Sequence, residues 1–371
     1  MRLISDQKIE QFKEELKKRK IDAALFLTSE PIHDVNIEYF TGFQQTRFFS
    51  FSCLLISQNN SVLVVSPLSY DQALMEAEAD EIINLKDYSN SLTKILKEKL
   101  KRFGTIGIVE RIFPHKLSRK FKIKFRDISD IILDLRSQKE PKEIERIEKA
   151  CHITNQGIKF IERNLDRKMT ERGLALALQQ KLIKKGSEMA FPTIVTSGNR
   201  SSFIHPHPST TNKKIQKGLG LIDFGVRYKG YCSDVTVPFT VSRLSARQRR
   251  MVKTVEKAYQ KAINTLKIGI PTWKVHNSAE RVIKKNRFEF KHSVGHGIGL
   301  DLHDLPSLSP KPKVKEELKD WKEFKLKENM TFTIEPGVYE LGIGGIRLEN
   351  DVLMTKNGPK ILTESKPIII S

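Results

Sequence analysis

The first 136 residues alternate short apolar runs with longer polar stretches. Apolar runs of four or five residues are typical of buried strands, and polar stretches of helical length between them predict helices. This order predicts an α/β layer domain that closes near residues 134–136, before a polar segment that contains Pro141. The apolar runs are residues 23–27, 53–57, 62–65 and 106–109, and the polar stretches lie near residues 6–19, 68–79 and 91–102.

The rest of the chain predicts helices that cover strands. Long helices are expected from about residues 142 and 170, and Ser245 with Gln248 forms a capping-box pattern ahead of another. Glycine-bounded segments near the C-terminus are rich in Val, Ile, Phe, Tyr and Thr, which predicts strands. Two domains, 1–136 and 137–371, are therefore expected. Apolar residues that recur at helical spacing, and so predict a core-facing helix, are Met251, Val255, Tyr259, Ala262 and Leu266.

Length and composition fit a protein with two hydrophobic cores. The 371 residues exceed the usual domain of ~100–200 residues, and 39% of them are hydrophobic. Cys53, Cys151 and Cys232 show neither metal-ligand nor disulfide spacing, which favours a reducing compartment. The N-terminus lacks the apolar stretch of a signal peptide, and no run is long enough to span a membrane. We therefore expect a cytoplasmic protein with no membrane partner.

The net charge is +21, from 65 basic and 44 acidic residues. Such a balance can indicate binding to nucleic acid or another polyanion. The lysines mostly alternate with acidic residues, as in residues 311–327, and no stacking-aromatic motif accompanies them. A solvated loop is therefore favoured over a ligand-binding lid for residues 311–327. Nucleic acid is not expected as a partner, and a protein that only binds nucleic acid or another polyanion, without catalysis, is the alternative.

Two acidic pairs stand near turns in the C-terminal part of the chain. Asp223 and Asp234 flank a polar turn, and with Tyr228 and Lys229 as its loop residues they would face each other across a hairpin. Directly opposed residues have Cβ atoms about 4.5–5.5 Å apart. Two carboxylates that close repel each other unless cations lie between them. The pattern therefore predicts a cation site.

Glu335 and Glu349 repeat this arrangement around the turn at residues 342–345, and His296 lies between the two acidic pairs in sequence. Four carboxylates and one imidazole suit hard to borderline divalent ions, so manganese, cobalt, iron or zinc is more plausible than copper. Two such ions about 3.5–4 Å apart can hold a bridging water, lower its pKa and polarise a carbonyl. These residues predict the two-metal site of a hydrolase.

The five segments resemble those of the metallopeptidase family that contains methionine aminopeptidases, aminopeptidase P and prolidase. The resemblance is strongest to the aminopeptidase P and prolidase branch, because residues 36–43 are similar to its N-terminal domain and residues 139–145 to its domain junction. It implies an α+β architecture, in which a smaller α/β domain of the creatinase/prolidase N-terminal type precedes a C-terminal pita-bread domain. In the latter, a mostly antiparallel sheet carries the metals.

The resemblance also implies a role for each ligand. Asp223 would bind one metal alone, Asp234 and Glu349 would bridge both, and His296 and Glu335 would complete the shell of the other. Glu335 is further implied as the proton shuttle between the bridging water and the leaving nitrogen. Two departures from the family pattern, Val235-Thr236 in place of a Thr-Arg pair and Asn350 in place of an aspartate, remove no ligand.

Four further positions resemble substrate-contacting residues. His303 is implied to stabilise the oxyanion, and the chain must turn in the seven residues after His296 if both side chains point inward. For a second substrate histidine, counting forward from residue 199 favours His205, which we prefer, and counting backward from residue 215 favours His207. His292 is implied to line the pocket for the residue after the cleaved bond. Arg347 is implied to orient Asp234 or the substrate.

The activity that the resemblance implies is metal-dependent hydrolysis of Xaa-Pro bonds by an exopeptidase. The moderate length of the N-terminal domain favours Xaa-Pro dipeptidase (prolidase) over Xaa-Pro aminopeptidase (aminopeptidase P), because in family dimers the partner's N-terminal domain restricts the cleft. The expected partners are peptides with proline in the second position and a second copy of the chain. The expected cofactors are two divalent ions per chain, manganese or cobalt. An aminopeptidase of different specificity is an alternative.

Overall fold

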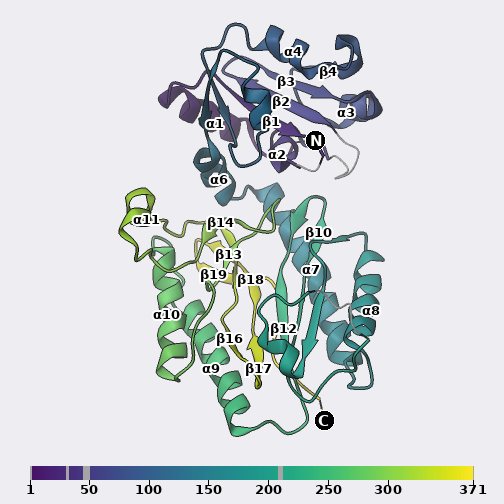
Figure 1. Cartoon of the computed structure of the whole chain (residues 1–371), viewed down its shortest axis with the longest axis vertical. Coiled ribbons are helices and arrows are strands. Elements are labelled where there is room, and N and C mark those ends of the chain that lie inside the picture. The colour runs from purple at the N-terminus through teal and green to yellow at the C-terminus, as the bar shows by residue number, and fades with distance from the viewer. Residues whose placement is uncertain (1, 31–32, 45–50, 208–211, 371) are drawn as a thin grey trace. The chain divides into compact units, whose positions relative to one another are not determined.

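A computed structural model describes the chain except for residues 1, 31–32, 45–50, 208–211 and 371 (Figure 1). It divides into two compact units, residues 1–136 and 137–371. None of the helices in the described ranges combines the length and the apolar character needed to cross a bilayer.

The first unit is built on a six-stranded mixed sheet. Its strands β1, β2, β3 and β5 coincide within one residue with the four apolar runs, so these predictions are confirmed. Strands β1 and β2 are buried along their whole length, which explains why they are apolar without alternation. In spatial order the strands are β4 (Glu81–Asn84), β3 (Ser61–Val65), β2 (Ser52–Ser57), β1 (Ala23–Thr28), β5 (Thr105–Ile108) and β6 (Lys124–Asp127).

Helices and short 3-10 turns connect these strands. The first helix begins after Ser5, whose side chain accepts a hydrogen bond from the Lys8 amide, and it buries Phe12 and Leu16. The three polar stretches contain α1, α3 and α4, whereas α2, α5 and α6 were not predicted. The elements are α1 (Asp6–Lys18), α2 (Val35–Thr41), η1 (Pro67–Ser69), α3 (Tyr70–Glu76), η2 (Leu85–Tyr88), α4 (Leu92–Lys99), α5 (His115–Ser118) and α6 (Ser129–Ser137).

The second unit has helices on both sides of its strands. In Figure 1, α7 and α8 lie on one side and α9 and α10 on the other. The predicted capping box of Ser245 and Gln248 is present at the start of α9, and the five apolar positions that follow it are buried in one cluster, as predicted. The helices are α7 (Pro141–Asn164), α8 (Glu171–Ile183), η3 (Gly198–Ser202), α9 (Ala246–Ile263), α10 (Thr272–Lys285) and α11 (Lys315–Asp320).

The strands of this unit pair antiparallel, except that β12 and β20 run parallel. The mostly antiparallel sheet and the α+β class are therefore confirmed. The sheets are β20-β12-β9-β8, β14-β13-β15-β18-β19, β11-β10-β7 and the hairpin β16-β17. Their strands are β7 (Glu188–Met189), β8 (Ile194–Ser197), β9 (Gly218–Phe224), β10 (Val226–Tyr228), β11 (Tyr231–Cys232), β12 (Val235–Val241), β13 (His296–Gly297), β14 (Asp304–Ser307), β15 (Thr331–Ile334), β16 (Gly337–Glu340), β17 (Gly344–Arg347), β18 (Asn350–Thr355), β19 (Gly358–Ile361) and β20 (Ile368–Ile370).

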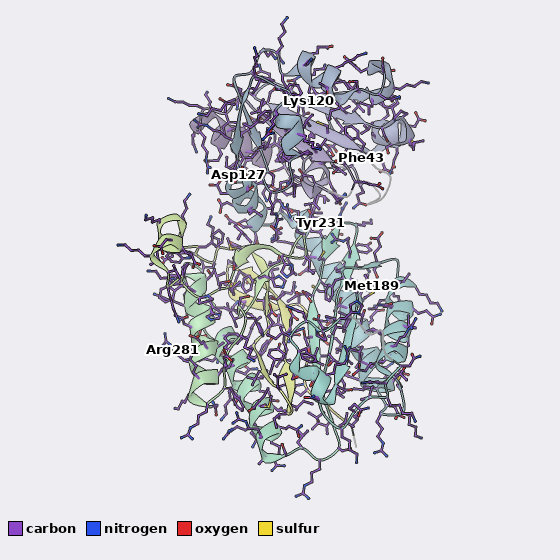
Figure 2. All side chains as sticks on the ribbon, in the orientation of Figure 1. Phe43, Lys120, Asp127, Met189, Tyr231 and Arg281 are labelled. Carbon is purple, nitrogen blue, oxygen red and sulfur yellow. The ribbon has the colours of Figure 1, made fainter. Side chains whose placement is uncertain are left out.

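Long-range hydrogen bonds hold α7 against the strands. The hydroxyl of Tyr231, labelled in Figure 2, donates to Glu143 Oε1 over 2.9 Å, and both side chains are buried. Thr154 on the same helix shares a 2.6 Å hydrogen bond with Ser233. These bonds fix the turn that carries Asp234 against a rigid helix.

Candidate metal centre

The first acidic pair is diagonal, not directly opposed. Tyr228 pairs with Tyr231, so the two turn residues are Lys229 and Gly230, and the predicted loop at Tyr228 and Lys229 is wrong by one residue. Lys229 and Gly230 have φ values of 45° and 87°. Positive φ at both central positions is typical of a type I′ turn, in which glycine carries no steric cost.

This turn shifts the pairing of the aspartates. Asp223 on β9 lies opposite Thr236 on β12, two residues beyond Asp234. The predicted direct pairing of Asp223 with Asp234 is therefore wrong. A shift of two residues preserves the face of a strand, and diagonal neighbours remain within reach of each other. Both carboxylates still line the same cleft.

The second acidic pair has the predicted register. Ile334 pairs with Asn350 on one side, and Gly337 pairs with Arg347 on the other. Continuing either register puts Glu335 opposite Glu349, at the short interruption between the two ladders. The direct opposition predicted for this hairpin is confirmed.

His296 reaches the acidic residues from a neighbouring strand. Gly297 pairs with Phe332 on β15, and a Cβ atom at Gly295 would lie 1.9 Å from the Thr333 carbonyl oxygen, so only glycine allows this approach. The His296 amide also donates to Thr333 Oγ1 over 3.1 Å. The strand therefore lies tightly against the one that leads to Glu335.

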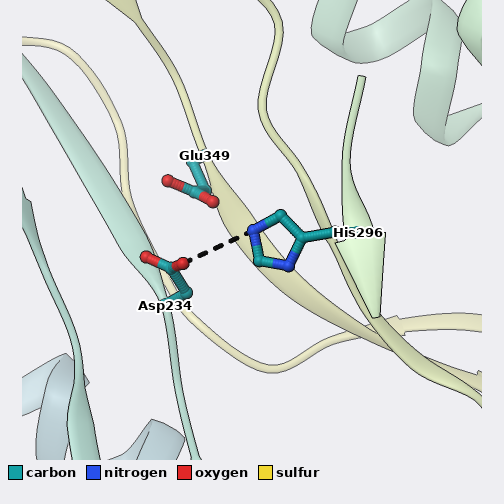
Figure 3. A group of neighbouring side chains, drawn as sticks. All are labelled: Asp234, His296 and Glu349. Atoms are coloured by element: carbon teal, nitrogen blue, oxygen red, sulfur yellow. Dashed lines mark ion pairs between the residues drawn. The ribbon is translucent and has the colours of Figure 1, made fainter. Parts of the chain in front are cut away.

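Figure 3 shows the centre of the cluster, where Asp234, His296 and Glu349 converge. One ligand atom from each lies within 4.8 Å of the others, an arrangement that could hold a metal ion. His296 Nε2 is 3.6 Å from Asp234 Oδ2 and 3.8 Å from Glu335 Oε1. His296 Nδ1 lies 3.1 Å from the Gly297 carbonyl oxygen, a contact that favours the proton on Nδ1 and leaves Nε2 free to bind a metal.

Asp223 joins the cluster through Arg347. The guanidinium hydrogen-bonds Asp223 Oδ2, donates to Thr236 Oγ1 over 2.7 Å and to the Tyr339 hydroxyl over 3.0 Å. Thr236 in turn donates to Glu349 Oε2 over 2.6 Å. Arg347 Nε also lies 3.9 Å from Glu349 Oε2, so the carboxylates that Arg347 contacts are Asp223 and Glu349, and not Asp234.

Burial makes this group of carboxylates hard to ionise without cations. Burial and the neighbouring carboxylates raise the pKa values of Asp234 and Glu349 well above their usual range. Burial raises the pKa of Glu335 to about 7. Burial also raises the pKa of Asp223, although the nearby Arg347 guanidinium lowers it in part. Asp234 Oδ1 is buried, with no hydrogen-bond partner among the described residues. An orphaned carboxylate oxygen in such a cluster fits a site for divalent cations.

Burial has the opposite effect on the histidine. It lowers the pKa of His296 to about 4, so the ring is neutral at physiological pH. A neutral imidazole is the form that binds metals.

The substrate-contacting candidates line the same cleft of about 620 Å³. The His303 ring lies 4.2 Å from that of His296, so the chain turns between them as predicted. His292 Nδ1 is 4.0 Å from Glu335 Oε2. His205 and His207 both line the cleft. Burial and Arg347 lower the pKa of His205 whereas Asp223 raises it, which puts this histidine within the field of the proposed ligands.

The sequence analysis missed Tyr339 and Asp351 as residues around the ligands. Asp351 Oδ2 accepts the Asp234 amide over 3.0 Å and the Cys151 thiol over 3.4 Å. Its place two residues after Glu349, on the same strand face, was a signal that could have found it. Thr236, noted only as a departure from the family pattern, contacts both Arg347 and Glu349.

Both units match known families. Residues 145–356 match metallopeptidase family M24, and residues 8–138 match the creatinase/prolidase N-terminal domain. The Xaa-Pro dipeptidase of Pyrococcus furiosus is 33% identical, covering 90% of this chain and 92% of that protein. The Xaa-Pro dipeptidase of Pyrococcus horikoshii is 31% identical, covering 99% of each.

Solved structures agree with these relatives. The prolidase from Pyrococcus horikoshii OT3 has a TM-score of 0.85 at 30% identity, covering 98% of this chain and 99% of that one. The X-Pro aminopeptidase from Thermotoga maritima MSB8 has a TM-score of 0.80 at 30% identity, covering 95% of this chain and 99% of that one.

Proposed function

This chain belongs to metallopeptidase family M24, and from that premise we propose that it is a metal-dependent exopeptidase that hydrolyses Xaa-Pro bonds. Xaa-Pro dipeptidase is the favoured activity because full-length relatives at 31% and 33% identity carry that name. The observation that carries the proposal is the convergence of buried Asp234 and Glu349 with partly buried His296 in one cluster.

The family uses two divalent metal ions, and the donor set of this chain fits them. We propose that Asp223, Asp234, His296, Glu335 and Glu349 hold two ions, with manganese or cobalt favoured over iron or zinc. When bound, the ions supply a water of lowered pKa and polarise the substrate carbonyl.

The chain's own residues would move the proton and orient the peptide. Glu335, whose Oε1 lies 3.8 Å from His296 Nε2 in the cluster, can accept a proton from the water and return it to the leaving proline nitrogen. His303 and His205, which both line the cleft, would donate hydrogen bonds to the carbonyl oxygen as negative charge develops there. His292 would line the pocket for the proline side, and His207 would bind substrate further from the ligands.

The experiment that tests the proposal compares Xaa-Pro dipeptides with Xaa-Pro-Yaa tripeptides, using purified protein loaded with manganese or cobalt. Cleavage of the dipeptides alone is expected. Comparable kcat/KM values for the tripeptides would instead assign an aminopeptidase. Hydrolysis of neither substrate, with two metals bound per chain, would overturn the proposal.

We further propose a cytoplasmic homodimer. Cys53, Cys151 and Cys232 are buried and form no disulfide in the described part of the chain, which fits a reducing compartment. Leu68 and Met75 in the first unit are 89% and 88% exposed, as expected for residues that a second copy covers. Light scattering should give twice the chain mass of 42.6 kDa.

A further inference from the structure

A second groove of about 1110 Å³ is lined by Val241, at the end of β12 that is remote from the proposed ligands. Asp223 is near one end of β9, whereas Val241, which lines the groove, pairs with Gly218 at the other. Five residues of strand separate the two places by about 17 Å. The groove is therefore a separate hollow from the peptidase cleft at this end, and the described residues of the two linings are adjacent in sequence only at Phe203 and Ile204.

Six basic residues line this groove, and among its described lining residues there is no Asp or Glu. One of the six, Arg200, is neutralised by buried Glu171, 2.9 Å away. For the other five, the described part of the chain shows no ion pair, and all five are exposed. They are Arg167, Lys168, Lys213, Lys214 and Lys217.

Along the sequence, alternation of lysines with acidic residues argued against a polyanion partner, but the residues that line this groove do not alternate in that way. The groove's cations come from residues 167–168, 200 and 213–217, and residues 212–217 contain three lysines and no acidic residue. Folding thus concentrates positive charge that looks dispersed along the sequence. Such a concentration attracts a polyanion and releases its counterions on binding.

The remaining lining favours a nucleic acid over other polyanions. Phe203 at the groove is 49% exposed, and an exposed phenyl ring provides a surface on which any base can stack. Asn199 uses Oδ1 to accept the Gly342 amide over 2.8 Å, and its side-chain NH₂ remains a donor for a base or phosphate. We propose that this groove binds a single-stranded nucleic acid, through its phosphates on the lysines and a base on Phe203.

Fluorescence anisotropy with labelled ~12-nucleotide single strands of RNA and DNA tests the proposal, since sites of this kind cover roughly 4–16 nucleotides. The variant is the triple charge reversal Lys213→Glu, Lys214→Glu and Lys217→Glu. It should bind at least tenfold more weakly at 50 mM salt. It should also reduce the slope of log K against log salt by about 2, because each phosphate contact of a single strand contributes about 0.7.

The matched control reverses three exposed lysines of α9, Lys253, Lys257 and Lys261, which changes the net charge equally. Equal weakening by both triple variants would overturn the proposal, because net charge and not the groove would then govern binding. Absence of binding by the unaltered protein at 50 mM salt would also overturn it. The triple Lys→Gln variant at the groove adds no negative charge, and it should also bind more weakly than the unaltered protein.

Phe203→Ala separates a nucleic acid from a generic polyanion. It should weaken oligonucleotide binding by about tenfold, the usual effect of losing one stacked base, and leave inorganic polyphosphate binding unchanged. Equal affinities of polyphosphate and oligonucleotide, both unaffected by this variant, would overturn the assignment to nucleic acid. Xaa-Pro hydrolysis should stay unchanged in the lysine variants, so failure here is separate from failure of the peptidase proposal.

Discussion

Among single residues, Arg347 connects two proposed ligands that come from different sheets. It contacts Asp223 directly, and it reaches Glu349 both as an ion pair at 3.9 Å and through Thr236, while its Nη1 also donates to the Tyr339 hydroxyl. A guanidinium has a planar fork of donors that can hold several acceptors at fixed angles, which a lysine ammonium cannot do. The residue is therefore suited to keep Asp223 aligned with the rest of the cluster.

We expect Arg347→Lys to keep the positive charge and lose this alignment. Turnover of Xaa-Pro dipeptide should fall about 10–100-fold, as is usual when groups that orient ligands are changed. The measurement is kcat together with the metal content from elemental analysis. Arg281→Lys, at the exposed arginine labelled in Figure 2, is the matched control and should change neither. Full activity of the Arg347 variant would contradict the proposed role.

Glu335→Gln removes the proton acceptor while keeping the side-chain shape. We expect kcat to fall by about 10²–10⁴-fold, the usual contribution of a general acid or base. Manganese content must be measured in parallel, because Glu335 is also a proposed ligand. Glu340→Gln, which alters a surface pair with Arg247, serves as the control. The proton-shuttle role fails if the metal-loaded Glu335 variant keeps near-normal kinetics.

At the scale of elements, the two hairpins show what local sequence can and cannot predict. The facing glutamates of the second hairpin were predicted, but its turn lies at residues 341–343 and not at 342–345, because Gly344 and Gly345 pair with Glu340 and Tyr339. The first hairpin was shifted, because Tyr228, Lys229 and Gly230 are all compatible with a turn by polarity. Only the backbone conformation that glycine accepts decides between the two loops.

Turn chemistry gives a stability prediction for this hairpin. Gly230→Ala adds a Cβ at a φ of 87°, which should destabilise the fold by about 1–2 kcal/mol. Lys229→Asn creates the Asn-Gly pair preferred in type I′ turns and should be neutral or stabilising. For a unit of this size, each kcal/mol lost lowers the melting temperature by about 2–4 °C. Measured on metal-free protein, the melting temperature should therefore fall in Gly230→Ala and should not fall in Lys229→Asn. Equal melting temperatures would argue against the type I′ turn.

The convergence of the ligands was predicted, but the specific contacts that hold them between elements distant in sequence were not. The strands of the first unit and the buried face of α9 were predicted from the spacing of apolar residues, because that spacing records which residues of an element are buried. Arg347 and Asp223, by contrast, are 124 residues apart, and their contact depends on how β17 lies against β9. The same holds for Asp351 and Asp234, 117 residues apart. The ligands were recognisable as types of side chain, whereas the residues that hold them in place needed the fold.

For the whole molecule, the net charge hides how the charges are distributed in the fold. A net charge of +21 coexists with a buried group of four carboxylates, which only one guanidinium, that of Arg347, contacts among the described residues. In the metal-free protein these carboxyl groups bind protons more tightly than in the unfolded chain, where their pKa values are about 4. The stability that this adds is present below pH about 4 and is lost as pH rises through the raised pKa values, which for Glu335 is about 7.

Metal binding must displace those protons, so it should stabilise the protein more as pH rises. Saturating manganese is expected to raise the melting temperature more at pH 7.5 than at pH 5.5. Calorimetric titration of manganese at pH 6, in two buffers of different ionisation enthalpy, should show net proton release, and the release should shrink by pH 8. His296 contributes nothing to it, because its pKa of about 4 leaves the ring already neutral. Glu335→Gln should release fewer protons at pH 6. Manganese binding without proton release at that pH would mean that the carboxylates are ionised before the metal arrives, contrary to the effect expected from their burial.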